Sequence, residues 1–265
     1  MRALGLKPRR RLSQSFLEDQ RVAAAIIRAA QLDPRTDVLE VGPGLGVLTE
    51  RLARRARHLV AVELDPHLAE WLRTELAGYE NVSIRTDDIL HVDPSSLFAS
   101  EYVVVANLPY HITSPALRHL LAAGPPHASR LVVMLQAEVA ERIAAGPGHM
   151  SALAITLQAQ ARVKRLRRVP AAAFYPRPKV DSALLLLEPL PEAERSIARS
   201  DLMPFEELVR AGFKQPRKTL ANSFADGLGV PKNESIARLK RATVDPTVRP
   251  EALALDDWVR LYRTR

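Results

Sequence analysis

The chain has 265 residues and a formal net charge of +8, and 47% of its residues are hydrophobic. That hydrophobic fraction excludes a mainly disordered chain, and the length suffices for one large domain plus a small one. The sequence contains no cysteine, which excludes disulfides, zinc–thiolate sites, iron–sulfur clusters and cysteine nucleophiles.

A basic chain with a pI of about 10.1 favours polyanionic partners, nucleic acid before anionic membrane. The basic N-terminus is not followed by an apolar signal region, and no apolar run reaches the length needed to span a membrane. We therefore expect a soluble cytoplasmic protein.

The first 18 residues are basic, and their cations form either a solvated tail or an arm that contacts phosphates. Asp19 is expected to cap a helix that runs to about Gln31 and ends before Asp33-Pro34.

A strand, a glycine turn and a helix come next, which is the usual start of a nucleotide-binding fold. Asp37–Val41 is the strand, and Gly42-Pro43-Gly44-Leu45-Gly46 follows it directly. Glycines let the backbone approach a ligand, and the N-terminus of the following helix favours a negative group. The spacing is neither that of dinucleotide enzymes nor that of a phosphate-binding loop, which would need a following lysine. A tight connection without a ligand remains the alternative explanation.

Two later strands end in carboxylates. His58–Val62 leads into Glu63, which is placed to accept hydrogen bonds from ribose hydroxyls, while Asp65 is expected to cap the next helix. Asn81–Arg85 leads towards Asp88, and a carboxylate at that position could meet an adenine amino group. An ordinary turn aspartate explains the second spacing nearly as well.

The fourth strand, Tyr102–Val105, brings Asn107-Leu108-Pro109-Tyr110 to the sheet edge where open α/β folds bind ligands. An ordinary Asn-Pro turn into a helix over 114–123 explains the tetrapeptide taken alone. An amide oxygen and a backbone carbonyl could also accept both N–H bonds of an exocyclic amine and place its nitrogen for attack. Tyr110 could then stack on a base that is single-stranded or flipped out. S-adenosylmethionine suits the whole set, because it combines an adenosine without phosphates, an amino-acid tail and a sulfonium methyl group.

The remaining elements complete an α/β chain, and the alternation of strands and helices predicts a parallel, doubly wound, Rossmann-like sheet with right-handed crossovers. Further strands are expected over 130–136, 163–169 and 182–188, helices over 138–145 and 151–161, and a Pro-rich loop over 170–178. Four short helices are expected beyond a polar boundary, over 205–213, 219–225, 233–241 and 256–262. We divide the chain into a basic N-terminal arm (1–18), a domain with the expected S-adenosylmethionine site (19–190) and a small helical domain (191–265) whose basic face could bind RNA. The basic face of the last part is explained equally well by simple solvation.

The ordered motifs resemble those of the ribosomal RNA adenine N6,N6-dimethyltransferases, most closely the type that modifies small-subunit ribosomal RNA. The motifs that carry this resemblance extend nearly from end to end: Gln14–Leu17, Glu40–Thr49, Glu63–Asp65, Asn107–Tyr110, Gln136–Arg142, Phe174–Ser182 and Phe213–Leu220.

The resemblance implies an S-adenosylmethionine site and two successive methylations of each of two adjacent adenines in an assembling small subunit. It also implies that 1–18 closes on the cofactor, that 19–190 is the methyltransferase domain and that 191–265 is the RNA-binding domain. The implied cofactor-binding residues are Gln14, Ser15, Leu17, Gly42, Gly44, Glu63, Leu64, Asp88, Ile89 and Asn107. The implied catalytic turn is Asn107, the Leu108 carbonyl, Pro109 and Tyr110, with Phe174 as a second stacking aromatic. The implied RNA-binding residues are Arg9, Arg10, Arg11, Arg177, Lys179, Lys214, Arg217 and Lys218. We expect no metal, no membrane and a monomer.

The chain departs from the family pattern at three places. Ser15 stands where the family usually has asparagine, His111 replaces a common asparagine, and residues 148–151 lack the usual Tyr-Gly-Arg. The first departure puts one cofactor hydrogen bond in doubt.

Three alternatives stay open. They are the related large-subunit enzyme that confers macrolide resistance, a protein-glutamine methyltransferase, and a non-catalytic RNA-binding or transcription factor on the same fold. The Gly42–Gly46 turn and the Phe213–Leu220 element favour the small-subunit type. Leu108 and the basic charge argue against the glutamine enzyme, and the intact acids with Asn107 argue against a non-catalytic protein.

Overall fold

The structure of the chain is a computed structural model that describes residues 15–264. By its internal contacts the described chain divides into two compact units. The first unit extends to Ala140 and resumes over Lys164–Pro189, and the second comprises Glu141–Val163 and the chain from Leu190 onward. The segment 141–163 was expected in the domain 19–190, but its Met150, Ala154 and Ile155 pack in the C-terminal hydrophobic core. The functional division into domains stays a prediction.

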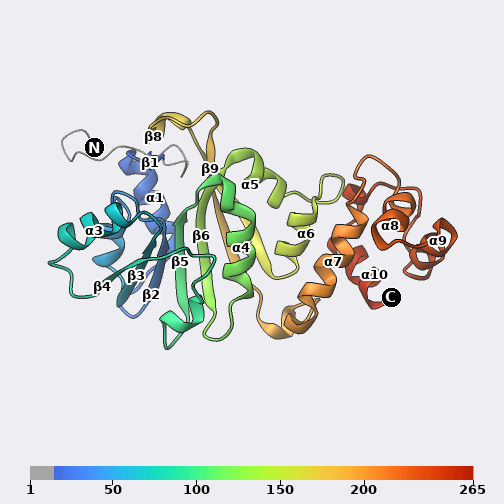
Figure 1. Cartoon of the computed structure of the whole chain (residues 1–265), viewed down its shortest axis with the longest axis horizontal. Coiled ribbons are helices and arrows are strands. Elements are labelled where there is room, and N and C mark those ends of the chain that lie inside the picture. The colour runs from blue at the N-terminus through green and yellow to red at the C-terminus, as the bar shows by residue number, and fades with distance from the viewer. Residues whose placement is uncertain (1–14, 265) are drawn as a thin grey trace. The chain divides into compact units, whose positions relative to one another are not determined.

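The first unit contains the body of a seven-stranded sheet with the order β4-β3-β2-β5-β6-β9-β7 (Figure 1). The strands are β2 (Asp37–Val41), β3 (His58–Glu63), β4 (Val82–Thr86), β5 (Tyr102–Asn107), β6 (Ala128–Gln136), β7 (Ala161–Val169) and β9 (Ser182–Pro189). Strands β2 to β6 pair in parallel, which confirms the predicted Rossmann-like α/β class.

Strand β9 corrects the expectation of a wholly parallel sheet, because it runs antiparallel to β6. Gln136, at the end of β6, lies opposite Ser182, at the start of β9. The chain enters β9 from the loop that follows β7, without the crossover helix that a parallel neighbour requires. The sheet is therefore mixed.

Helices pack on the sheet, whose central strands β2 and β5 are buried on both faces. They are α1 (Gln20–Ala30), α2 (Thr49–Ala53), α3 (Pro66–Glu75) and α4 (Thr113–Ala122). As predicted, the Asp19 carboxylate caps α1 and accepts from the amides of Arg21 and Val22, at 2.7 and 3.2 Å. Helix α1 buries Val22 and Ile26 in the same core as Val103, and α4 packs against β6 (Figure 1).

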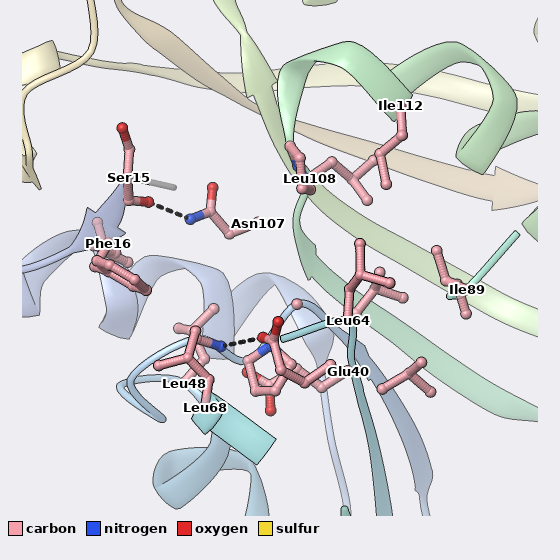
Figure 2. A pocket seen from close by; sticks show the side chains of 18 of the residues that line it. Ser15, Phe16, Glu40, Leu48, Leu64, Leu68, Ile89, Asn107, Leu108 and Ile112 are labelled. Atoms are coloured by element: carbon pink, nitrogen blue, oxygen red, sulfur yellow. Dashed lines mark hydrogen bonds between the residues drawn. The ribbon is translucent and has the colours of Figure 1, made fainter. Parts of the chain in front are cut away.

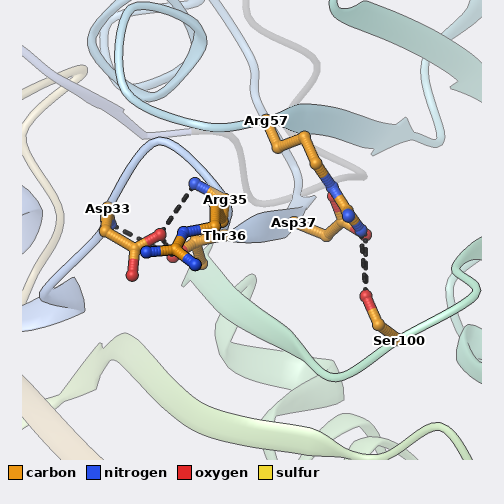
Figure 3. Close-up of polar contacts among 6 residues, drawn as sticks. All are labelled: Asp33, Arg35, Thr36, Asp37, Arg57 and Ser100. Carbon is orange, nitrogen blue, oxygen red and sulfur yellow. Dashed lines mark hydrogen bonds and ion pairs between the residues drawn. The ribbon is translucent and has the colours of Figure 1, made fainter.

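A polar cluster holds the amino end of β2, the end opposite the carboxyl-terminal edge (Figure 3). Asp37 is buried there, and Arg57 donates to its two oxygens from Nε at 2.8 Å and from Nη2 at 2.5 Å. Arg57 Nη2 also donates to Ser100 Oγ at 2.9 Å. Asp37, Arg57 and Ser100 thus link the start of β2, the residue before β3 and the segment before β5.

Two short strands that the sequence did not predict form a separate ribbon. Strand β1 (Phe16–Leu17) pairs antiparallel with β8 (Phe174–Tyr175), with Phe16 opposite Tyr175 and Leu17 opposite Phe174. This pairing joins segments more than 150 positions apart. Two-residue strands carry no periodicity from which the contact could be inferred.

The second unit is helical. Helix α5 (Ala137–Ile143) leads into it, followed by α6 (Ala152–Gln158), α7 (Leu202–Gly212), α8 (Leu220–Leu228), α9 (Lys232–Arg241) and α10 (Leu255–Arg263). The four predicted C-terminal helices are confirmed, and the helix expected over 151–161 ends earlier because β7 begins at Ala161. Phe205, Phe224 and Trp258 are fully buried at the centre of this unit. Within residues 15–264, no helix has the length and apolar character needed to cross a membrane.

Candidate active site

A pocket opens at the carboxyl ends of β2, β3 and β5 and lies wholly in the first unit (Figure 2). Thirteen sequence-predicted site residues line it: Ser15, Leu17, Gly42, Gly44, Glu63, Leu64, Asp88, Ile89, Asn107, Leu108, Pro109, Tyr110 and Phe174. Gln14 lies outside the described residues. The parallel strands thus bring together groups that are far apart in the sequence.

The glycine turn needs its glycines for both conformation and space. Gly42, Gly44 and Gly46 have φ angles of +67°, +58° and +77°, a region that side chains disfavour. A Cβ on Gly44 would lie 2.9 Å from the Phe16 ring. The backbone of the turn is therefore open to a close neighbour, and Phe16 already occupies one side of it.

Glu63 is the last residue of β3, and two backbone amides orient its buried carboxylate. Oε2 accepts from Gly44 N at 3.0 Å, and Oε1 accepts from Asp65 N at 2.9 Å. Burial raises the pKa of Glu63, while these hydrogen bonds oppose the rise. Each oxygen keeps a further lone pair for a ligand hydroxyl. As predicted, Asp65 caps α3 and accepts from His67 N at 3.0 Å.

Glu40 is a pocket residue to which sequence reasoning gave no role. It is 1% exposed, and its Oε2 has no hydrogen-bond partner within the described part of the chain. Burial raises the pKa of this carboxyl to about 8, the nearby Thr49 hydroxyl partly opposes the rise, and Glu63 adds to it. The signal in the sequence was an acid inside the strand, between Leu39 and Val41 and just before the glycine turn.

Asp88 and Ile89 follow β4 at the next position along the edge. Asp88 Oδ1 accepts from Leu90 N at 3.0 Å, and Ile89 is buried against the pocket. An acid and an apolar side chain thus lie next to each other on one wall, which suits an amino-substituted ring.

Asn107 ends β5 and is oriented by the segment before β1 (Figure 2). Its Nδ2 donates one of its two N–H groups to the Ser15 carbonyl at 3.3 Å, which orients the amide and leaves Oδ1 free to accept. The turn that follows is anchored by its own backbone. Leu108 N donates to Met134 O at 3.0 Å, and Pro109 O accepts from Ile112 N at 3.1 Å.

The two predicted stacking aromatics differ in their surroundings. The Tyr110 hydroxyl lies 3.0 Å from Ser182 Oγ, and burial raises the pKa of Tyr110. Phe174 is 4% exposed and packs with Leu17 in the hydrophobic core while also lining the pocket. Phe16, which packs on Gly44 and lines the pocket, was missed as a site residue because an isolated aromatic before a helix cap has no distinctive spacing.

The predicted RNA-binding residues are distributed over both units. Arg177 and Lys179 are exposed on the loop after β8, and Arg217 and Lys218 are exposed between α7 and α8. Lys214 instead donates to Asp226 O at 3.0 Å and pairs with its carboxylate at 3.5 Å. Arg9, Arg10 and Arg11 lie outside the described residues.

Among the residues described, no group of three or more His, Asp or Glu side chains is arranged to hold a metal ion.

The mixed sheet and the acids and Asn107 turn at its carboxyl-terminal edge define a Rossmann-like methyltransferase. A family profile described as ribosomal RNA adenine dimethylase matches residues 5–264, and the chain belongs to this family. The predicted family is thereby confirmed, and the protein is an RNA methyltransferase.

Several curated relatives are similar over nearly the whole chain. The ribosomal RNA small subunit methyltransferase A of Dehalococcoides mccartyi strain 195 is 41% identical over 262 residues, 97% of this chain and 88% of the relative. The protein of the same name from Desulfitobacterium hafniense strain DCB-2 is 42% identical over 257 residues, 96% of this chain and 91% of the relative.

Solved structures agree with this assignment. The crystal structure of the 23S rRNA methyltransferase ErmE matches with a TM-score of 0.72 at 30% identity, covering 94% of this chain and 98% of that one. A dimethyladenosine transferase from Plasmodium falciparum matches with a TM-score of 0.75 at 24% identity, covering 93% and 95%, and supports the fold.

Proposed function

We propose that this protein transfers methyl groups from S-adenosylmethionine to the N6 amino groups of two adjacent adenines in small-subunit ribosomal RNA during ribosome assembly. One observation carries the proposal. The Asn107 amide oxygen, the glycine turn and the Glu63 carboxylate all line one pocket at the edge of the sheet.

The residues present fit the cofactor. The buried Glu40 oxygen without a partner suits the ammonium group of an amino-acid tail, and Gly42, where an added Cβ would meet only Asn107 O at 3.7 Å, lines the same pocket. Glu63 is oriented to accept from ribose hydroxyls, and Asp88 with Ile89 suits the adenine ring. When bound, S-adenosylmethionine supplies an electrophilic methyl group.

The Asn107 turn would hold the target amine. Because Ser15 O accepts from Asn107 Nδ2, the Asn107 oxygen can accept one N–H of the amine, and the Leu108 carbonyl can accept the other. Two acceptors orient the nitrogen lone pair and favour its pyramidal form, which is the nucleophilic one. Tyr110, held through Ser182, can stack on a flipped base. No general base is required before transfer, since the nitrogen is neutral.

The small subunit is favoured over the large one by the relatives. The proteins named small-subunit methyltransferases are 41% and 42% identical to this chain, whereas the 23S enzyme ErmE is 30% identical.

The direct test is to incubate the protein and labelled S-adenosylmethionine with unmethylated small subunits, large subunits or free ribosomal RNA. We expect label in dimethyladenosine of small-subunit RNA. Label confined to large-subunit RNA would make this chain a large-subunit enzyme.

Asn107→Ala should abolish transfer and leave cofactor affinity nearly unchanged. Losing an acceptor that orients the amine is expected to lower kcat by at least about a hundredfold. The measurements are single-turnover methylation and calorimetric binding of S-adenosylhomocysteine. Asn233→Ala, an exposed asparagine on α9, is the matched control. Normal turnover in Asn107→Ala would remove this side chain from the mechanism.

A further inference from the structure

Tyr175 lies on the opposite face of the short ribbon from Phe174. Residues directly opposite each other in an antiparallel pair share a face, so Leu17 shares one with Phe174 and Phe16 shares the other with Tyr175. The first pair is buried in the core. Phe16, of the second pair, packs on Gly44 and lines the pocket. Tyr175 therefore lies beside a pocket residue, yet its side chain is 45% exposed.

The loop that carries Tyr175 onward is anchored at its far end. Asp181 accepts from Ala171 N and from Arg168 Nε, both at 2.9 Å, and its carbonyl accepts from Ala137 N at 2.9 Å. Pro176 and Pro178 further restrict the backbone between Tyr175 and this anchor. The Tyr175 ring is thus presented on a restrained segment, which lowers the entropy lost when a ligand binds to it.

The surroundings of Tyr175 are cationic. Arg177 and Lys179 are exposed on the same loop, and Arg177 is near enough to Asp181 to help lower the pKa of that carboxyl. An exposed aromatic beside exposed cations matches single-stranded nucleic acid, whose bases stack and whose phosphates carry negative charge. A protein partner would be expected to cover a larger apolar surface.

We infer that Tyr175 stacks on the nucleotide next to the target adenine and is a substrate-binding residue. The inference rests on the proposed RNA substrate. When the target base leaves its stack to enter the pocket, the neighbouring base loses a stacking partner. An exposed ring next to Phe16, on the ribbon that borders the pocket, can replace that partner, while Arg177 and Lys179 contact the flanking phosphates. Phe174 and Tyr175, adjacent in sequence, then serve two different bases.

Three variants separate stacking from a merely structural role. Tyr175→Ala removes the ring, Tyr175→Phe keeps its π-face, and Tyr175→Leu keeps apolar volume without a π-face. Met203→Ala, which removes another exposed apolar side chain, is the matched control. The probe is the unmethylated small subunit. The readouts are KM for the subunit, kcat, and calorimetric affinity for S-adenosylhomocysteine.

Tyr175→Ala and Tyr175→Leu should raise KM about ten- to a hundredfold, the range expected for one lost base–aromatic stack. Tyr175→Phe should stay within about twofold of wild type, and all variants should bind S-adenosylhomocysteine normally. Rescue by leucine would show that Tyr175 only covers Phe16, and an unchanged KM in Tyr175→Ala would also refute the inference. Failure of the wild type to methylate any ribosomal substrate would instead refute the proposed function.

Discussion

At the scale of single residues, Glu40 makes a prediction about pH. Its pKa is raised to about 8 by burial, whereas the same carboxyl in the unfolded chain titrates near 4.5. Between these values the unfolded chain has released a proton that the folded chain keeps, so the free energy of unfolding falls as pH rises and levels off above about 8. The wild type should lose on the order of a few kcal/mol of unfolding free energy over this pH range, whereas Glu40→Gln, which cannot ionise, should not.

The measurement is urea unfolding of the cofactor-free protein at pH 5, 6.5 and 8. The stability of Glu40→Gln relative to wild type should increase across this series. Glu75→Gln, exposed on α3, controls for the loss of one carboxylate. A constant difference between Glu40→Gln and wild type would mean that Glu40 is already ionised in the fold.

The sequence revealed residues whose chemistry is unusual at their position, and missed those whose role depends on a neighbour. Asn107 and Glu63 follow apolar strands, so the expected edge of the sheet could be read from the pattern, and both line the pocket. Phe16 acquires its place only through Gly44, and the Asn107 amide is oriented only through the Ser15 carbonyl. Contacts of that kind bridge distant parts of the chain and leave no local signature.

At the scale of elements, the crossing of α7 and α8 depends on a glycine. A Cβ on Gly227 would lie 2.2 Å from Ala211 O, a backbone atom that cannot rotate away. Gly227→Ala should therefore push the helices apart and lower the free energy of unfolding by about 1–3 kcal/mol or more. Gly146→Ala, where nothing lies within 4 Å of the added Cβ, should leave stability within about 1 kcal/mol of wild type. Equal melting curves for the two variants would show that the crossing tolerates the methyl group.

Elements with strong periodicity or capping residues were predicted well, and elements made by pairing were not. Asp19 and Asp65 begin helices as their residue types require, and the parallel pairing of β2 to β6 follows from strand–helix alternation. The antiparallel placement of β9 and the β1–β8 ribbon depend on which loop reaches which edge. Loop paths are decided by tertiary packing and not by local preference.

At the scale of the whole molecule, a net charge of +8 attracts any polyanion, so RNA docking must be separated from general attraction. Arg217 and Lys218 are exposed in the second unit, whereas Lys214 is already paired with Asp226. If the first two residues contact phosphates, replacing both with glutamine should weaken binding to small-subunit RNA. Each lost contact should also lower the slope of log affinity against log salt by about 0.7–0.9.

Lys240→Gln with Arg241→Gln changes the net charge equally on α9 and is the control. We expect the Arg217 and Lys218 pair to lower the salt slope by about 1.5 and the control to leave it nearly unchanged, with the cofactor affinity of both proteins equal to wild type. Equal effects of the two pairs would mean that this unit attracts RNA through its total charge. If neither double variant changes the salt slope, these residues do not contact the RNA. The loop that carries Arg177 and Lys179 would then be the docking surface to test.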